Sequence, residues 1–206
     1  MEQKKYIPTF DNVKIAIIGI GYVGLPLFCQ LSKLYSCIGY DVDHCRIKEL
    51  SNGIDSRNNV KANRICDAIS HSIVTTDIHK IATCNIFIVT VPTPINNNFV
   101  PDTSALENAC LAISKILRPK AIVVFESTVY PGATEELCVP LLSKNSRLVF
   151  NKDFFVGYSP ERINIGDDKH QISNVPKIIS GSTPDVTNFL ASIYQSVLEQ
   201  PVVIAS

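Results

Sequence analysis

The stretch 13–41, VKIAIIGIGYVGLPLFCQLSKLYSCIGYD, constrains the fold of this chain more than any other. An apolar run at 13–18 predicts a buried strand, which leads into the turn GIGYVG at 19–24 and a helix predicted over 22–33. A second apolar run, 37–40, ends in Asp41. A lone GxGxxG is weak evidence, but between a strand and a helix, with a carboxylate about 20 residues further on, it is typical of a dinucleotide-binding βαβ unit.

Strand-like and helix-like segments alternate through the rest of the chain. This alternation predicts an α/β fold of the Rossmann type, with a doubly wound, mostly parallel sheet and helices on both faces. Residues 1–12 are expected to form an N-terminal arm and residues 13–206 an NAD-binding Rossmann domain. A proline at 140 predicts a kink in its helix. The further strands are expected at 73–75, 85–91, 121–125, 154–158, 177–180 and 202–204, and the further helices at 43–51, 61–70, 105–117, 133–143 and 184–197.

The composition excludes several classes of function. The 206 residues are 46% hydrophobic, and 19 Lys and Arg balance 19 Asp and Glu, so no nucleic-acid or anionic-membrane partner is expected. Apolar runs are too short to span a bilayer, and the N-terminus lacks the apolar core of a signal peptide, so we expect a cytoplasmic protein. The seven cysteines include no CxxC pair and are expected to be small buried hydrophobes, with no metal site.

The glycine turn predicts a binding site for a dinucleotide. Gly19 would permit the tight bend, Gly21 would let the backbone approach a pyrophosphate, and Gly24 would allow close packing of helix on strand. The free N–H groups at the start of the helix would face the phosphates. Asp41 stands where an acceptor for a ribose hydroxyl is needed, which favours NAD over NADP. Arg46 is the counter-argument, because it can pair with the 2′-phosphate of NADP, flank the adenosine or lie in solvent.

Three further strand ends carry polar residues, at 91–94, 126–128 and 159–162. In a doubly wound sheet they meet at the carboxyl edge, beside the dinucleotide, although each one taken alone is equally well a turn former. Glu161 is a candidate general base or water-positioning group, and Thr128 is a candidate partner for the same water. Arg162 is a candidate contact to an anionic group of a substrate, or a surface cation.

Five motifs extend the signal beyond the glycine turn: IAIIGIGYVGLPL, VTVPTPI, PDTSAL, ESTVYPGATEELCVPLL and DFFVGYSPERINIGD. With them, residues 13–205 resemble the N-terminal domain of the UDP-glucose/GDP-mannose dehydrogenase family. The resemblance is strongest to the bacterial branch that oxidises UDP-N-acetylhexosamines to uronic acids for surface polysaccharides.

The resemblance implies an oxidation of C6 of a nucleotide sugar from alcohol to carboxylate, with two NAD molecules reduced in turn. It also implies a cysteine thiolate that traps the aldehyde and a thioester that water cleaves. Thr128 and Glu161 map to its water-handling and acid–base positions, and Glu161 and Arg162 are the candidate substrate contacts. The implied cofactor contacts are Gly19, Gly21, Tyr22, Val23, Gly24, Asp41, Arg46, Val91, Pro92, Thr93, Ser127 and Thr128.

Two departures from the family pattern matter. Ile165 stands where the family commonly has proline, or a second glutamate in the UDP-glucose branch, so a second carboxylate role is not assigned. The resemblance also implies a central helix with a catalytic lysine and a UDP-sugar-binding domain with the catalytic cysteine, and we expect both to lie outside this chain. We therefore expect this chain alone to be inactive, and the full-length protein to be a homodimer that binds a UDP-sugar.

Two alternatives remain open from the sequence. One is another Rossmann dehydrogenase, of the hydroxyacid or hydroxyacyl-CoA type, although that class leaves ESTVYPG and YSPERIN unexplained. The other is a non-catalytic NAD-binding module.

Overall fold

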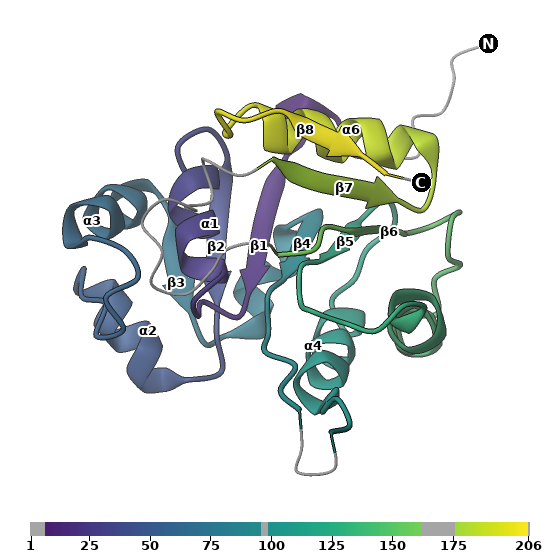
Figure 1. Ribbon diagram of the computed structural model, residues 1–206, viewed down its shortest axis with the longest axis horizontal. Helices are drawn as coiled ribbons and strands as arrows, with labels where there is room; N and C mark the ends of the chain where they lie inside the picture. The colour runs from purple at the N-terminus through teal and green to yellow at the C-terminus, as the bar shows by residue number, and fades with distance from the viewer. Residues whose placement is uncertain (1–6, 96–98, 162–175, 206) are drawn as a thin grey trace.

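The computed structural model describes residues 7–95, 99–161 and 176–205, which form one twisted sheet covered by helices (Figure 1). The strands lie in the order β3-β2-β1-β4-β5-β6-β7-β8. Neighbouring strands are parallel except for the pair β6 and β7. The strands are β1 (Lys14–Ile18), β2 (Ser36–Tyr40), β3 (Ile73–Thr75), β4 (Ile86–Val89), β5 (Ile122–Phe125), β6 (Phe155–Tyr158), β7 (Lys177–Gly181) and β8 (Val202–Ile204).

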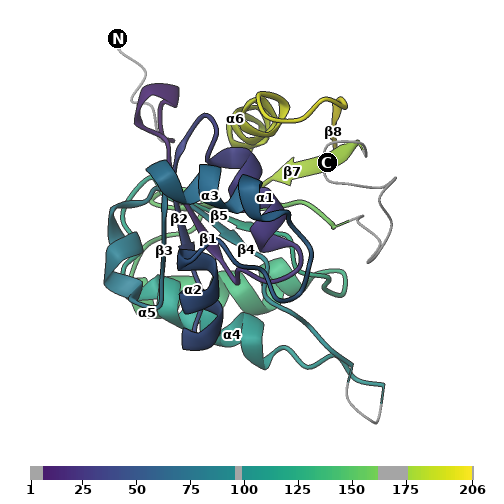
Figure 2. The ribbon, with the colours of Figure 1, turned by 90° about the vertical axis from the view of Figure 1, so that its left-hand side faces the viewer.

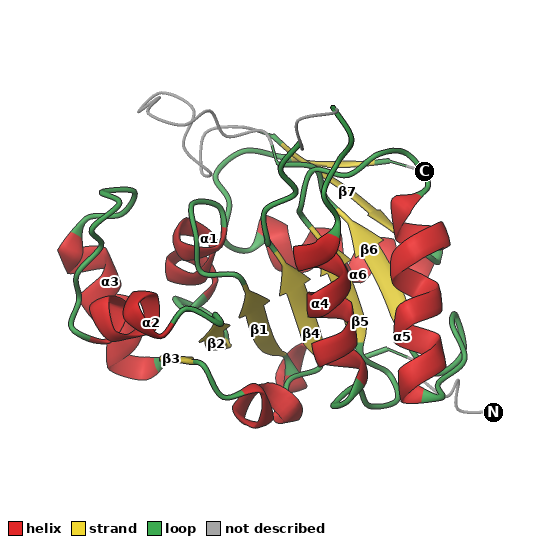
Figure 3. Ribbon diagram, turned by 90° about the horizontal axis from the view of Figure 1, so that it is seen from below, coloured by secondary structure: helices red, strands yellow, loops and turns green. Residues whose placement is uncertain are grey.

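Helices cover both faces of the sheet, as the alternation of segments predicts (Figures 2 and 3). Helices α1, α3 and α6 pack on one face, and α4 and α5 pack on the other. The α-helices are α1 (Gly24–Leu31), α2 (His44–Ser51), α3 (Ala62–His71), α4 (Ser104–Ser114), α5 (Val139–Ser146) and α6 (Pro184–Gln195), and the shorter helical turns are η1 (Phe10–Asn12), η2 (Ile78–Thr83) and η3 (Thr134–Cys138).

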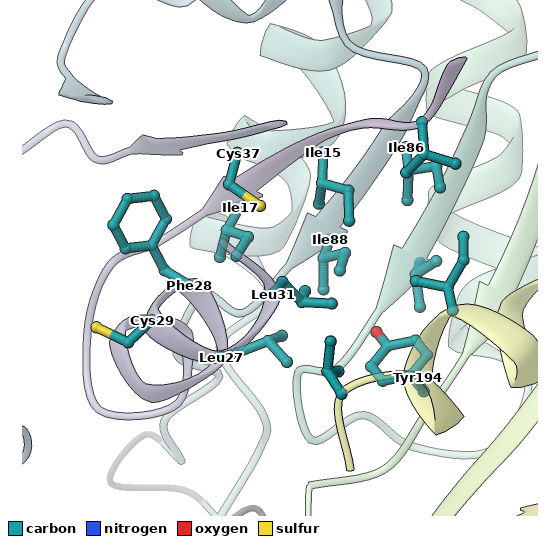
Figure 4. Packing of buried hydrophobic residues seen from close by; sticks show 14 of the residues in the cluster. Ile15, Ile17, Leu27, Phe28, Cys29, Leu31, Cys37, Ile86, Ile88 and Tyr194 are labelled. Carbon is teal, nitrogen blue, oxygen red and sulfur yellow. The ribbon is translucent and has the colours of Figure 1, made fainter. Parts of the chain in front are cut away.

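The two faces follow from the two-residue period of the strands. In β1, Ile15 and Ile17 enter the cluster under α1, α3 and α6, whereas Ala16 and Ile18 enter the cluster under α4 and α5. Figure 4 shows the first cluster, where residues of β1, β4, α1 and α6 meet. Burial on both faces explains why the strands are apolar almost throughout.

The parallel strands place their carboxyl ends at one edge of the sheet. The strands β1, β4, β5 and β6 run in the same direction, so the three polar strand ends share that edge as predicted. Strand β7 runs the opposite way and pairs Ser180 with Tyr158. Its first residue, Lys177, therefore also lies at the carboxyl edge.

The predicted strands and helices are present, and their ends shift by a few residues. The helix predicted over 133–143 is present and contains an irregularity just before Pro140. The chain forms the π-helical turn η3 and then α5, whose first turn contains Pro140. A proline has no N–H to donate to the preceding turn, and the wider helical turn before it accommodates that loss.

Candidate functional site at the carboxyl edge of the sheet

The glycine turn after β1 is held by backbone and hydroxyl contacts. Gly19 has a φ of +92°, and its N–H donates to the carbonyl oxygen of Tyr40 at 2.8 Å. A Cβ on Gly24 would lie 2.1 Å from the carbonyl oxygen of Gly19. The roles predicted for these two glycines within the fold are thus confirmed: one permits the bend, and the other permits close packing.

Thr90, at the end of β4, is a turn-holding residue that the sequence did not single out. Its hydroxyl oxygen lies 2.7 Å from the carbonyl oxygen of Gly19 and 3.0 Å from that of Ile18, so the hydroxyl donates across to the turn. A threonine in an otherwise apolar strand was the available signal, but threonine is also common in strands.

Gly21 differs from the other two glycines of the motif. Its φ is outside the left-handed region, and among the described residues a Cβ there would meet only the guanidinium of Arg57, at 3.6 Å. The packing of the chain therefore does not itself require glycine at this position. The open backbone at Gly21 fits the close approach of a dinucleotide diphosphate, which is the role that the motif predicts.

Asp41, at the end of β2, faces the same turn. Its carboxylate accepts from the N–H of Ile20 at 2.9 Å and from the N–H of Asp43 at 3.0 Å. A carboxylate offers about four lone-pair positions, so capacity remains for a hydroxyl donor. The geometry fits the predicted acceptor for a ribose hydroxyl.

Arg46 does not lie in solvent, and that alternative for it is wrong. The residue is 2% exposed, its Nε donates to the carbonyl oxygen of Ile20 at 2.9 Å, and its Nη1 donates to Asp55 at 2.7 Å. Burial of the guanidinium between the glycine turn and Asp55 makes it a support of the turn. Helix α2 places it there because Asp43, the N-cap, accepts from the N–H groups of Cys45 and Arg46.

The ends of β4 and β5 are joined by side-chain hydroxyls. Ser127 is buried and donates to the carbonyl oxygen of Val91 at 2.6 Å, and Thr93 donates to the carbonyl oxygen of Thr128. The side chain of Thr128 itself is exposed, as is Pro92. These contacts fix the two loops against each other and leave Thr128 at the surface of the edge.

A buried group of ionisable side chains at the same edge was missed from the sequence. The Nζ of Lys177 lies 2.6 Å from Glu126 and 3.4 Å from Glu161, and the hydroxyl of Tyr194 donates to Glu126. Glu126 is 1% exposed and the side chain of Glu161 is 11% exposed. Figure 4 shows Tyr194 in the apolar cluster, and its hydroxyl reaches Glu126 from there.

Two signals were available for this cluster. A lysine opens the apolar strand β7, and a glutamate directly follows the apolar strand β5. A charged residue at such a position is more often exposed, and only the antiparallel direction of β7 brings Lys177 to the carboxyl edge.

Electrostatics distinguish the members of the cluster. Burial raises the pKa of Glu126, the charge of Glu161 adds to this, and the ammonium of Lys177 opposes it. Burial alone would lower the pKa of Lys177, but the two carboxylates outweigh it and raise that pKa. Lys177 is therefore a firmly charged ammonium between two carboxylates.

Five of the seven cysteines are buried, as expected. Burial raises the pKa of Cys29 to about 11 and that of Cys84 to about 12, so neither is a thiolate at neutral pH. Cys45 and Cys66 are exposed. Within the described ranges, no group of three or more His, Cys, Asp or Glu is arranged to hold a metal ion.

Comparison with known proteins decides the family. Residues 13–198 match the model of the UDP-glucose/GDP-mannose dehydrogenase family, NAD binding domain. The chain belongs to this family. The predicted Rossmann fold and the NAD cofactor are confirmed with it.

Two similar relatives within the family are bacterial proteins. The chain is 48% identical over 187 residues to a UDP-N-acetyl-D-glucosamine 6-dehydrogenase of Pseudomonas aeruginosa, covering 91% of this chain and 44% of that protein. It is 45% identical over 188 residues to Protein CapL of Staphylococcus aureus, again covering 91% and 44%. The chain thus spans less than half the length of these curated relatives.

Solved structures agree with the fold. The crystal structure of NDP-N-acetyl-D-galactosaminuronic acid dehydrogenase from Methanosarcina mazei Go1 superposes with a TM-score of 0.87 at 26% identity, covering 94% of this chain and 44% of that one. The UDP-D-ManNAc dehydrogenase of Pyrococcus horikoshii gives 0.83 at 28% identity, covering 94% and 47%.

Two of the sequence predictions fall on residues outside the described ranges: the substrate contact at Arg162 and the departure at Ile165. Among the helices that the structure describes, we find none with the length and apolar character needed to span a membrane.

Proposed function

We propose that this chain is the cofactor-binding half of an NAD-dependent nucleotide-sugar 6-dehydrogenase. The reaction is the oxidation of C6 of a UDP-N-acetylhexosamine from alcohol to carboxylate, for the synthesis of a surface polysaccharide. The observation that carries the proposal is the meeting of two features at one sheet edge. One is a glycine turn whose middle glycine is left open, and the other is a glutamate held by a buried lysine.

The substrate class rests on the relatives. The two relatives compared above are a UDP-N-acetyl-D-glucosamine 6-dehydrogenase and Protein CapL, both more than 40% identical to this chain. UDP-N-acetylglucosamine is therefore the first substrate to test. We propose that the full-length protein works as a cytoplasmic homodimer and that residues 13–206 are its NAD-binding domain, with residues 1–12 as an arm.

The chain's own residues divide the work at the edge. Bound NAD would supply a hydride acceptor at the carboxyl edge. The open backbone at Gly21 and the N–H groups of Tyr22 and Val23 would face its diphosphate, and Asp41 would accept from a ribose hydroxyl. The wall of the NAD site on the nicotinamide side would be formed by Val91, Pro92, Thr93 and Ser127.

Glu161 is proposed as the acid–base residue. Lys177 donates to its carboxylate, which orients the group at the sheet edge, where a water or a substrate hydroxyl would meet it. Thr128, which is exposed on the same edge, would hold the same water. Arg162 remains a proposed contact to the anionic part of the substrate.

The first test is binding of NAD⁺ to this chain, measured by isothermal titration calorimetry. We expect a 1:1 complex, and we expect no NADH absorbance at 340 nm when UDP-N-acetylglucosamine is added to the chain alone. Absence of NAD⁺ binding would count against the proposal, and NADH formation would show that the isolated half is catalytic.

The second test uses the full-length protein. Glu161→Gln should lower kcat by about 100-fold or more, since a positioned acid–base group contributes about 10²–10⁴-fold. The matched control is Glu135→Gln, which removes an exposed carboxylate and should leave kcat unchanged. A panel of UDP-hexoses and UDP-N-acetylhexosamines, with NAD⁺ and NADP⁺, identifies the sugar. Full activity in Glu161→Gln would remove this residue from the mechanism.

A further inference from the structure

The loop between α2 and α3 is built around the buried carboxylate of Asp55. Its Oδ1 accepts from the N–H of Arg57 at 3.2 Å, and its Oδ2 accepts from the N–H groups of Asn59 at 2.8 Å and Val60 at 2.9 Å. Three backbone donors converging on one side chain fix the path of the loop locally.

Arg46 ties this loop to the glycine turn. One guanidinium donates both to Asp55 and to the carbonyl oxygen of Ile20, inside the turn itself. The position of the loop relative to the turn is therefore set by a buried, charge-assisted bridge. Residues of this loop that face the turn therefore have a fixed position relative to it.

Arg57 is one of these residues. Its Nη1 lies 3.6 Å from the position that a Cβ on Gly21 would occupy, and its side chain is 51% exposed. Its nearest ion-pair contact is with the half-exposed Asp43, at the 4.0 Å limit for such a pair. An exposed pair at that distance contributes little, so the guanidinium is available to a stronger anion.

We propose that Arg57 is a binding residue for the diphosphate of the dinucleotide. The inference rests on the function proposed above. Gly21 is the glycine at which the backbone approaches the diphosphate, and the guanidinium of Arg57 stands against that same glycine. A planar guanidinium matches two phosphate oxygens, whereas Arg46 is buried and engaged with Asp55.

The proposal assigns Arg57 to the diphosphate and not to a 2′-phosphate. Asp41 and Asp43 both lie near the ribose end of the site, and their charges disfavour a 2′-phosphate there. Arg57 thus strengthens binding of any ADP-containing ligand without converting the site to NADP.

The test measures binding of NAD⁺, ADP, adenosine and NADP⁺ to this chain by isothermal titration calorimetry at low and moderate salt. Arg57→Ala should weaken NAD⁺ and ADP about five- to tenfold, leave adenosine unchanged and reduce the salt dependence of binding. Arg57→Lys, which keeps the charge but not the planar fork, should be intermediate. Lys48→Ala removes an exposed cation from neighbouring α2 and should change none of these values.

The outcomes separate the inference from the proposed function. If the chain binds NAD⁺ and Arg57→Ala binds it equally well, or Lys48→Ala loses as much, the role of Arg57 is overturned and the NAD site stands. A loss confined to NADP⁺ would overturn the assignment to the diphosphate. If the unaltered chain binds no nucleotide, the proposed function fails and this inference fails with it. Circular dichroism checks that each variant is folded.

Discussion

Two buried carboxylates beside buried cations lie in different regions of the molecule, and their surroundings differ. Asp55 pairs with Arg46 beside the glycine turn, and Glu126 pairs with Lys177 at the ends of β5 and β7. Asp55 also accepts from three backbone N–H groups. Within the described part of the chain, the carboxylate of Glu126 has no such backbone donors, and it shares its lysine with a second carboxylate.

The pKa values of the two carboxyl groups shift in opposite directions. Burial alone would raise the pKa of Asp55, but hydrogen bonds from Arg46 and from the N–H groups of Val60 and Asn59 outweigh burial and lower it. For Glu126, complete burial prevails and raises the pKa, with the charge of Glu161 adding to the effect.

The comparison separates a scaffold from a site. The Asp55 network is nearly saturated with donors, so it fixes a loop and leaves the carboxylate nothing further to bind. The Glu126 network holds one ammonium between two carboxylates, an excess of negative charge that is typical of places where protons are handled. Glu161 is the partly exposed carboxylate of this network and lies at the sheet edge.

The largest expected loss of stability follows from replacing Lys177, the lysine of the Glu126 network. Lys177→Met should lower the free energy of unfolding by about 3–5 kcal/mol, because it leaves the carboxylate of Glu126 buried without a cation. Urea unfolding followed by circular dichroism measures this. The double variant Glu126→Gln/Lys177→Met removes both charges and should recover most of the loss. Equal destabilisation in the single and double variants would contradict the ion-pair explanation.

A somewhat smaller effect is expected at the first network. Asp55→Asn should cost about 3 kcal/mol at pH 7, because Arg46 loses its closest partner and the new amide cannot accept from all the donors. Glu49, at 3.6 Å from Arg46, offsets part of the loss. Urea midpoints for the variant and the unaltered chain give the difference.

The pH dependence of the same variant tests the sign of the shift. Since the pKa of Asp55 is lowered by folding, its contribution to stability is full above its ordinary value of 3.8 and is lost as the pH falls through the folded value. The unaltered chain should therefore lose more stability between pH 5 and pH 2.5 than Asp55→Asn does. If both proteins lose the same stability between pH 5 and pH 2.5, groups other than Asp55 cause the acid sensitivity.

The smallest of the three expected losses of stability is at the glycine turn, where Gly24 and Gly21 can be compared. Gly24→Ala should lower the free energy of unfolding by about 1–3 kcal/mol, because its Cβ would overlap the carbonyl oxygen of Gly19. Gly21→Ala has room for the methyl group and should leave stability within about 0.5 kcal/mol of the unaltered chain. The second variant should instead lose NAD⁺ affinity, measured by calorimetry. Retained affinity in Gly21→Ala would show that the ligand does not approach that backbone.

Much of the fold was predictable because its signals are local. Apolar runs predicted strands buried on both faces, and the motif around Gly19 and Gly24 predicted a turn whose sterics the structure confirms. Helix and strand ends were less accurate, since tertiary packing decides how far each segment extends. The π-helical turn before Pro140 is an example, because a proline signals a disturbance but does not specify its form.

The site was predictable where the position of a residue in a motif indicates one role. Asp41 at the end of a strand after a glycine turn is such a case, and its contacts with the turn fit the prediction. The role of Arg46 was not predictable, because an arginine close to Asp41 in sequence can bind a ligand or pair with a buried carboxylate. The partner, Asp55, is nine residues away and carries no motif.

The sequence by itself determined the family, the alternation of strands and helices and the bend of the glycine turn, because these depend on residues close together in the chain. Only the tertiary structure decided which charges meet. The reversed direction of β7 brings Lys177 to Glu126 and Glu161 across 51 and 16 positions of sequence, and the Asp55 loop brings Arg57 against Gly21. Coulomb energy depends on distance and burial in space, which spacing along the chain does not encode.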